Sequence, residues 1–140
     1  MFSIGSLSKQ TGVKVPTIRY YEQIGLISPP ERTEGNQRRY RKEALQRLGF
    51  IKHARELGFS IQSITALIEL HDHPDRSCAE ATTIAREQLS DVRERIVSLV
   101  RLESELLRIS EGCKGAGIVS DCYVFASLAD HRHCETQHWS

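Results

Sequence analysis

A run of 34 residues without glycine or proline, from Cys78 to Glu111, is the feature that most restricts how this chain can fold. Ser77 and Glu80 form an S-x-x-E capping box at its start, and Gly112 is placed to end it in a left-handed conformation. These signals predict one uninterrupted helix. Such a helix is about 50 Å long, which is longer than a small domain could cover.

Apolar residues recur along this run in alternating steps of three and four, and Glu103 interrupts the series once. The members of this stripe are Ala85, Leu89, Val92, Ile96, Leu99 and Leu106. A chain of 140 residues can bury one modest core, and the segment before the helix is too small to cover a stripe of that length. The stripe therefore predicts that the chain pairs with a second copy as a homodimer.

The two halves of the chain carry opposite charge. Residues 1–60 hold eleven Lys or Arg against five Asp or Glu, a formal charge of +6, whereas residues 61–140 carry −5. A basic front half favours a polyanionic partner such as nucleic acid. No apolar run approaches the roughly 18 residues of a membrane span, and the first twenty residues lack the layout of a signal peptide. We therefore expect a cytoplasmic chain that does not contact a membrane.

The basic half predicts two short helices and a hairpin. Ser3 can cap a first helix that Gly12 ends, and Pro16 suits the start of a second helix that Gly25 closes. Two such helices joined through a glycine-containing turn outline a helix-turn-helix. Residues 26–40 contain helix-breaking prolines and a glycine, so they read as two extended arms around a hairpin tip. This outline is that of a wing.

Two further helices are predicted over residues 42–57 and 61–71, from apolar residues at helical spacing. The first carries Leu45, Leu48, Phe50, Ile51 and Ala54 mostly on one face. The fold expected is mainly α. Its five segments are a winged helix-turn-helix domain with connecting helices (1–72), a linker (73–77), a dimerisation coiled-coil helix (78–111), a metal-binding loop with a short helix (112–128) and a His/Cys-containing tail (129–140).

Side chains suited to DNA lie on the second predicted helix and on the wing. Arg side chains can bond guanine edges, while Tyr hydroxyls and other Arg side chains suit phosphate oxygens. Any one of these charges could merely solvate a surface, but their clustering favours double-stranded DNA. The predicted DNA-binding residues are Thr17, Arg19, Tyr20, Tyr21, Arg38, Arg39 and Tyr40, with Lys52 and Arg55 extending the footprint.

Three cysteines occupy the two ends of the long helix. In a reducing compartment, thiols serve metals or redox chemistry more often than structural disulfides, although a lone cysteine is commonly an inert buried thiol. Cys113 and Cys122 lie nine residues apart on a glycine-containing loop, and Cys78 lies at the other end of the helix. Along a continuous helix Cys78 and Cys113 are about 52 Å apart, so one ion cannot reach both within one chain. If two helices pair antiparallel, the partner's Cys78 comes close to Cys113 and Cys122.

Sulfur ligands select soft or borderline ions, so mercury, lead, cadmium and zinc fit the three cysteines, and zinc would need one ligand more. The tail could supply it, because it gathers four possible metal ligands. These are His131, His133, Cys134 and His138. A polar terminus of this kind can equally be without function.

The segment "IGSLSKQTGVKVPTIRYYEQIGLISPPERTEGNQRRY" closely resembles the N-terminal signature of the mercury-resistance-regulator (MerR) family, notably in "TIRYYE", "GLI" and the ending. The resemblance continues through "LGFIKHARELGFSIQSI" and the long helix, over about residues 3–128. The resemblance implies a winged helix-turn-helix and an antiparallel coiled-coil dimer. It also implies that Arg19, Tyr20, Arg38 and Tyr40 occupy positions that contact DNA or build the wing. The cysteine at position 78 is similar to family members that sense divalent ions, because members that sense monovalent ions typically have Ser at this position.

The function that this resemblance implies is transcription activation of heavy-metal resistance or efflux genes. The dimer would bind an over-long promoter spacer where RNA polymerase binds, and would distort the DNA when a divalent ion binds. Alternatives are a cytoplasmic metal buffer or chaperone without a DNA target, and a family regulator with another effector, such as redox state. No phosphate loop, nucleophile elbow or catalytic triad is recognisable, so we do not expect an enzyme.

Overall fold

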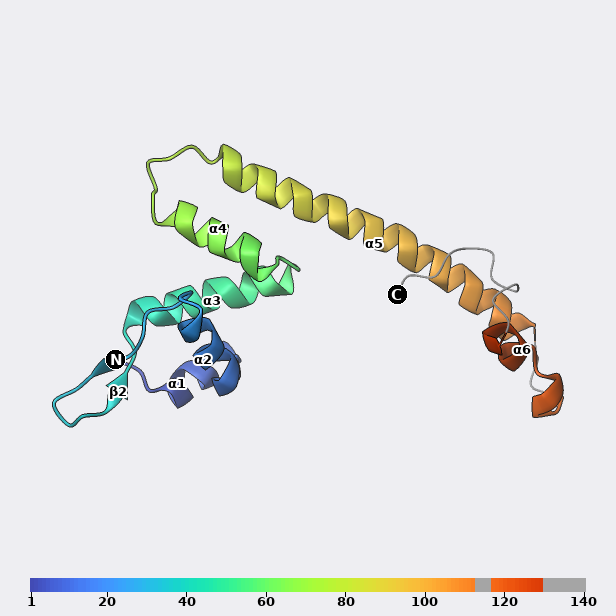
Figure 1. Cartoon of the computed structure of the whole chain (residues 1–140), viewed down its shortest axis with the longest axis horizontal. Helices are drawn as coiled ribbons and strands as arrows, with labels where there is room; N and C mark the ends of the chain where they lie inside the picture. The colour runs from blue at the N-terminus through green and yellow to red at the C-terminus, as the bar shows by residue number, and fades with distance from the viewer. Residues whose placement is uncertain (113–116, 130–140) are drawn as a thin grey trace. The chain divides into compact units, whose positions relative to one another are not determined.

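The computed structural model describes residues 1–112 and 117–129, and within them it is mainly helical (Figure 1). The chain divides within its longest helix into two compact units, residues 1–88 and the residues from 89 onward. The elements are α1 (Ile4–Thr11), α2 (Val15–Gln23), β1 (Glu31–Arg32), β2 (Arg38–Arg39), α3 (Lys42–Glu56), α4 (Ile61–His71), α5 (Ala79–Glu111), the 3-10 turn η1 (Val119–Asp121) and α6 (Tyr123–Ala129).

The predicted helix-turn-helix is confirmed as α1 and α2. The Ser3 hydroxyl accepts a hydrogen bond from the Ser6 backbone N–H at 3.1 Å, which caps the start of α1. Gly12 ends α1 with a φ of 77°, a left-handed conformation that glycine adopts without a steric penalty. The second helix begins at Val15, one residue earlier than predicted, and Pro16 lies in its first turn.

The predicted wing is confirmed as a two-stranded antiparallel hairpin, in which Glu31 pairs with Arg39 and Arg32 with Arg38. Its tip turns at Asn36, a residue type that tolerates the positive φ of 59° found there. Two backbone hydrogen bonds of 2.8 and 2.7 Å join Phe2 to Tyr40 at the base of the wing. The N-terminus therefore fixes the wing beside the helix-turn-helix.

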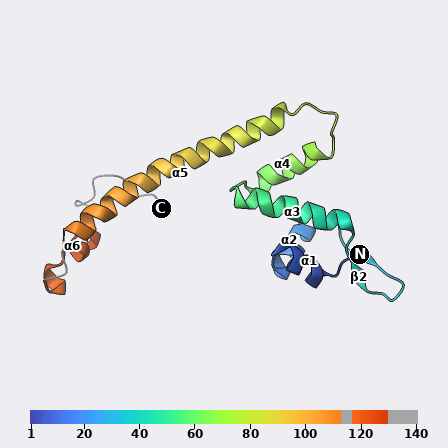
Figure 2. The ribbon, with the colours of Figure 1, turned by 180° about the vertical axis from the view of Figure 1, so that it is seen from behind.

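The core of the first unit lies between α1, α2, α3 and α4. In Figure 1 and Figure 2, α3 lies between α4 on one side and α1 and α2 on the other. The largest fully buried side chains are Leu7, Ile18, Leu48, Ile51 and Ile64. Phe50 departs from the predicted apolar face of α3, because its side chain is 37% exposed. The four helices thus form a single core that supports α2 and the wing.

Helix α5 has 33 residues and is therefore about 50 Å long. Its predicted apolar stripe is largely exposed within one chain: Leu89 is 46%, Ile96 54%, Leu99 56% and Leu106 62% exposed. A row of large apolar side chains in contact with water is a face that a partner would cover. None of the helices in the described part of the chain is long and apolar enough to span a membrane.

The two ends of α5 differ from the predicted caps. At the start, the Ser77 hydroxyl accepts from the Ala79 N–H at 3.2 Å, and the Glu80 carboxylate lies 3.6 Å from the Arg76 guanidinium. At the other end, the prediction that Gly112 is left-handed is wrong, because the positive-φ glycines of the described residues are Gly12, Gly25 and Gly58.

Candidate nucleic-acid interface and metal centre

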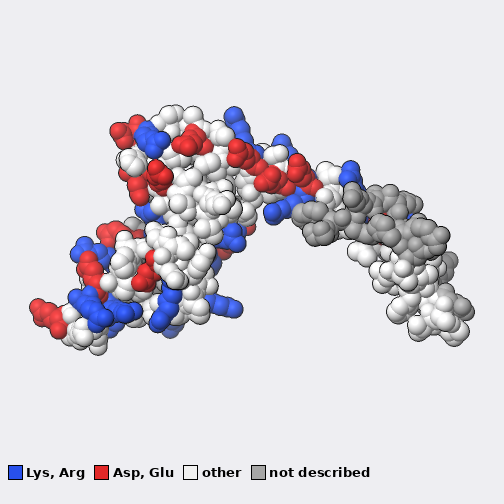
Figure 3. All heavy atoms as spheres, viewed as in Figure 1, with Lys and Arg blue, Asp and Glu red and all other residues white. Residues whose placement is uncertain are grey.

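Basic side chains gather where α2 faces the wing. Arg19 of α2 and Arg38 and Arg39 of β2 line one hollow of about 520 Å³. In Figure 3, Lys and Arg side chains gather around the wing and the first two helices beside a few acidic groups, and both acidic and basic groups lie along the visible part of α5. Arg19, Tyr20 and Arg38 are exposed. A concave, positively charged surface of this kind can accept phosphate oxygens.

A partly buried hydrogen bond joins the base of the wing to α2 at this hollow. The Tyr40 hydroxyl donates to the Glu22 carboxylate at 2.7 Å. Burial, reinforced by this hydrogen bond, raises the pKa of Tyr40 to about 12. The phenol therefore stays protonated throughout the physiological range and keeps its proton on the side of Glu22. Sequence reasoning missed Glu22, because a partner 18 residues away gives no local signal.

The predicted DNA-binding residues do not all present their side chains to solvent. Tyr21 is 7% and Tyr40 is 4% exposed, so both side chains belong to the core. Thr17 and Arg39 are half-buried. Arg19, Tyr20 and Arg38 are therefore the members of this set whose side chains are exposed, while Tyr21 and Tyr40 pack in the core that supports α2 and the wing.

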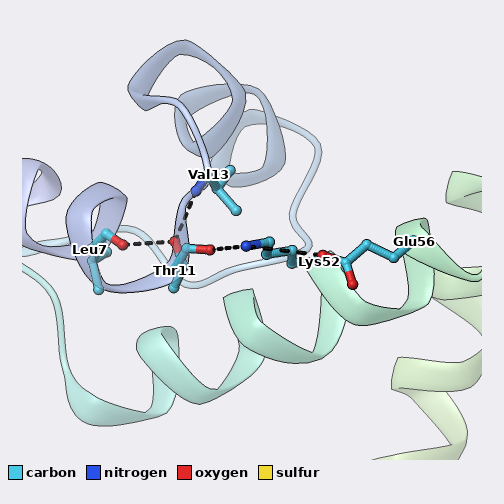
Figure 4. A network of polar contacts seen from close by, with 5 residues as sticks. All are labelled: Leu7, Thr11, Val13, Lys52 and Glu56. Atoms are coloured by element: carbon cyan, nitrogen blue, oxygen red, sulfur yellow. Dashed lines mark hydrogen bonds and ion pairs between the residues drawn. The ribbon is translucent and has the colours of Figure 1, made fainter.

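Lys52 takes part in a network that holds the end of α1 against α3 (Figure 4). Its ammonium donates to the Thr11 carbonyl oxygen at 2.6 Å and lies 4.0 Å from the Glu56 carboxylate. The Thr11 hydroxyl in turn donates to the Leu7 carbonyl at 2.7 Å and accepts from the Val13 N–H at 3.2 Å. The Lys52 cation therefore neutralises carbonyl groups at the C-terminal end of a helix, where a positive charge is stabilising.

Arg55 has a similar local contact. Its guanidinium donates from Nη1 to the Phe59 carbonyl oxygen at 2.8 Å, across the turn that follows α3. Arg55 remains exposed despite this contact. Lys52 and Arg55 were predicted as an extension of the DNA footprint, and the structure gives each a bond within the protein.

A salt titration of DNA binding distinguishes a phosphate contact from such internal bonds. The logarithm of the DNA association constant falls linearly with the logarithm of the salt concentration. Replacing Arg38 with Gln should make this slope shallower by about 0.9 per chain, because one phosphate contact is lost. Replacing Lys52 with Gln should leave that slope unchanged and lower thermal stability instead. Fluorescence anisotropy measures DNA affinity at each salt concentration. A shallower slope for Lys52→Gln would show that Lys52 contacts a phosphate.

The two described thiols are free and lie beside the starts of helices. Cys78 is exposed, directly precedes α5, and its carbonyl oxygen accepts from the Thr82 N–H at 2.9 Å. Cys122 is half-buried between η1 and α6, and its carbonyl accepts from the Ala126 N–H at 3.2 Å. Residues Cys113, His131, His133, Cys134 and His138 lie outside the described residues. Soft thiol donors that water can reach are chemically suited to a thiophilic ion.

Within residues 1–112 and 117–129, no three His, Cys, Asp or Glu side chains come together in a way that could hold a metal ion. Cys78 precedes α5 and Cys122 follows it, so a helix of 33 residues lies between them in the chain. His71 and His73 line a hollow of about 270 Å³ with Cys78, between α3, α4 and the start of α5. The thiols thus have the chemistry of a metal site that the described part of one chain does not complete.

Two helices with a wing, a basic hollow between them and a long helix with an exposed apolar stripe define the class of winged helix-turn-helix regulators. A family model described as MerR helix-turn-helix family regulatory protein matches residues 2–70, and one described as MerR DNA binding matches residues 45–109. The chain belongs to the MerR family.

Individual relatives extend this similarity over most of the chain. The HTH-type transcriptional regulator ZntR of Escherichia coli (strain K12) is 41% identical over 116 residues, which cover 82% of each chain. The mercuric resistance operon regulatory protein of Bacillus cereus is 35% identical over 127 residues, 91% of this chain and 96% of the relative. The crystal structure of the regulator PbrR691 from Ralstonia metallidurans CH34 in complex with lead(II) superposes with a TM-score of 0.76 at 35% identity. That superposition covers 91% of this chain and 99% of that one.

Proposed function

We propose that this protein is a metal-responsive activator that binds promoter DNA as a homodimer and responds to a thiophilic divalent ion. The observation that carries the proposal is the combination, in one chain, of a basic helix-turn-helix hollow and free thiols before and after α5. One relative is named for mercuric resistance, and another was solved in complex with lead(II). Both support an ion of the thiophilic class, which includes mercury, lead, cadmium and zinc.

The metal centre proposed is shared between two chains. Cys113 and Cys122 of one chain and Cys78 of the partner subunit would each supply a thiolate. The exposed stripe of α5 supports the pairing, since Ile96, Leu99 and Leu106 need a cover of comparable length. Antiparallel pairing would place the start of one α5 beside the end of the other, so the dimer would hold two equivalent sites.

The ion would act on a regulator that already occupies its operator. Because each site joins both chains, binding one ion can reorient the two DNA-binding units relative to each other, and so twist or bend the promoter between the half-sites. RNA polymerase would then engage a promoter whose spacer it otherwise reads poorly. The protein would work in the cytoplasm as a regulator and not as an enzyme.

Electrophoretic shifts and in vitro transcription on the same promoter test this function. The dimer should bind the operator with similar affinity with and without metal, and transcription should rise only when metal is present. If metal released the protein from DNA without activating transcription, the mechanism would be derepression. If the protein bound metal but captured no promoter fragment, it would be a metal buffer.

A further inference from the structure

The last turn of α5 lies in contact with the first residue of α6. The ring of Tyr123 covers the backbone of Gly112 so closely that a Cβ atom at position 112 would collide with the ring atoms Cδ1, Cγ and Cε1. Any residue other than glycine would displace the tyrosine. This contact explains the glycine at position 112, whose φ is not in the left-handed region.

The other end of the same tyrosine is held by α5. Arg108, one turn before Gly112, donates from Nη1 to the Tyr123 hydroxyl at 2.6 Å. The Gly112 N–H donates to the Arg108 carbonyl at 3.0 Å, so the residues that hold the ring and the hydroxyl belong to one helical turn. Hydrogen bonds from a charged donor are stronger than those between neutral groups.

Burial around this contact fixes α6 against the end of α5. Ile109 is 7% exposed, and the polar side chains of Glu105 and Ser127 are each 3% exposed. The two views of the fold place α6 beside the last turns of α5 (Figure 1, Figure 2). Other side chains of α6 are open, with Phe125 56% and Leu128 72% exposed, so α6 buries only part of its surface.

We propose that Arg108, Gly112 and Tyr123 form a latch that positions the thiol of Cys122 for metal binding. Gly112 directly precedes Cys113 and Tyr123 directly follows Cys122. The contact between residues 112 and 123 therefore joins the two ends of the segment 113–122, whose first and last residues carry thiols. None of the three latch residues need touch the ion. This inference rests on the proposed function, and it identifies residues that set the metal affinity of the centre.

The physical basis of the latch is preorganisation. Without it, binding an ion through both thiols would have to close a ten-residue loop and order its ends at the moment of binding. With residues 112 and 123 already in contact, part of that entropy cost is met by folding before the ion arrives. The latch should therefore affect the affinity for metal and leave the number of thiolate ligands unchanged.

Cadmium titration of the reduced full-length dimer, followed by the thiolate-to-metal charge-transfer band and by competition with a chelator, tests the latch. Tyr123→Phe removes only the hydroxyl and should weaken Cd²⁺ binding about tenfold, as expected for one charge-assisted hydrogen bond. Gly112→Ala displaces the ring and should weaken binding further. Gly117→Ala is the matched control, because a Cβ atom at Gly117 meets no atom of the described residues within 4 Å.

The variants with a weakened latch should reach the same band intensity at saturation, with operator affinity and melting temperature close to those of the unchanged protein. That combination separates a positioning role from a general loss of structure. If Tyr123→Phe and Gly112→Ala bind Cd²⁺ as tightly as Gly117→Ala, the latch proposal is wrong while the proposed function stands. If Gly112→Ala also loses stability, the Tyr123→Phe result decides. If the unchanged protein does not bind Cd²⁺, the proposed function fails and the latch fails with it.

Discussion

Replacing Cys122 with serine is expected to abolish metal-dependent transcription while operator affinity stays nearly unchanged. A serine hydroxyl stays protonated and is a poor ligand for a soft ion, so the proposed site loses one of its three anionic donors. Metal affinity should fall by more than about 100-fold, because removing a ligand costs more than removing the groups that support it. Reporter induction and operator binding by the same preparation measure the two effects separately.

The same loss is expected for Cys78→Ser and Cys113→Ser, and a much smaller one for Cys134→Ser, which serves as the control. A mixed dimer tests whether two chains share the site. When a chain carrying Cys78→Ser pairs with one carrying Cys122→Ser, one complete set of three thiols remains across the interface. Such heterodimers should regain about half of the bound metal. A site built within one chain predicts no recovery.

The sequence predicted the helices well because their boundaries are set by local chemistry. Helix α4 begins after Ser60, whose hydroxyl accepts from the Ser63 N–H at 3.1 Å, and it spans the predicted residues 61–71. Helix α5 is equally predictable, since 33 residues without a breaker leave few other folds. In contrast, the exposure of Phe50 depends on which neighbours α3 meets, and helical periodicity alone does not contain that information.

The candidate site was less predictable, because its contacts join residues that are distant in the sequence. Lys52 reads as a surface charge until its bond to Thr11, 41 residues away, is known. Tyr40 reads as a DNA contact until its burial against Glu22 is seen. Gly112 was assigned to a helix cap, which is the commonest local use of glycine, whereas its position depends on the ring of Tyr123. The spacing of the cysteines still predicted that one chain cannot complete the site, because the length of α5 separates Cys78 from the cysteines that follow the helix.

Placing a charge in the stripe of α5 is expected to separate the two chains. Ile96 and Leu99 are 54% and 56% exposed in one chain, and in a coiled coil both would be covered by the partner. Each buried Leu or Ile contributes about 1.5–3 kcal/mol, and twofold symmetry makes every substitution count twice. Ile96→Glu should therefore weaken the dimer by about a thousandfold or more, since a buried charge adds its own penalty. Analytical ultracentrifugation measures this change, and Arg101→Glu, an exposed position on the opposite face, is the matched control.

Loss of the dimer should also alter the metal centre, which a substitution in the DNA-binding unit would leave intact. The Ile96→Glu chain keeps every cysteine, yet as a monomer it should lose the contribution of Cys78 to the thiolate charge-transfer band and bind metal more weakly. Its affinity for a full operator should fall as well, because a monomer contacts one half-site. A monomer that still held an ion through Cys78 together with Cys122 would contradict the shared centre, since α5 separates Cys78 from the residues after Glu111 by about 50 Å.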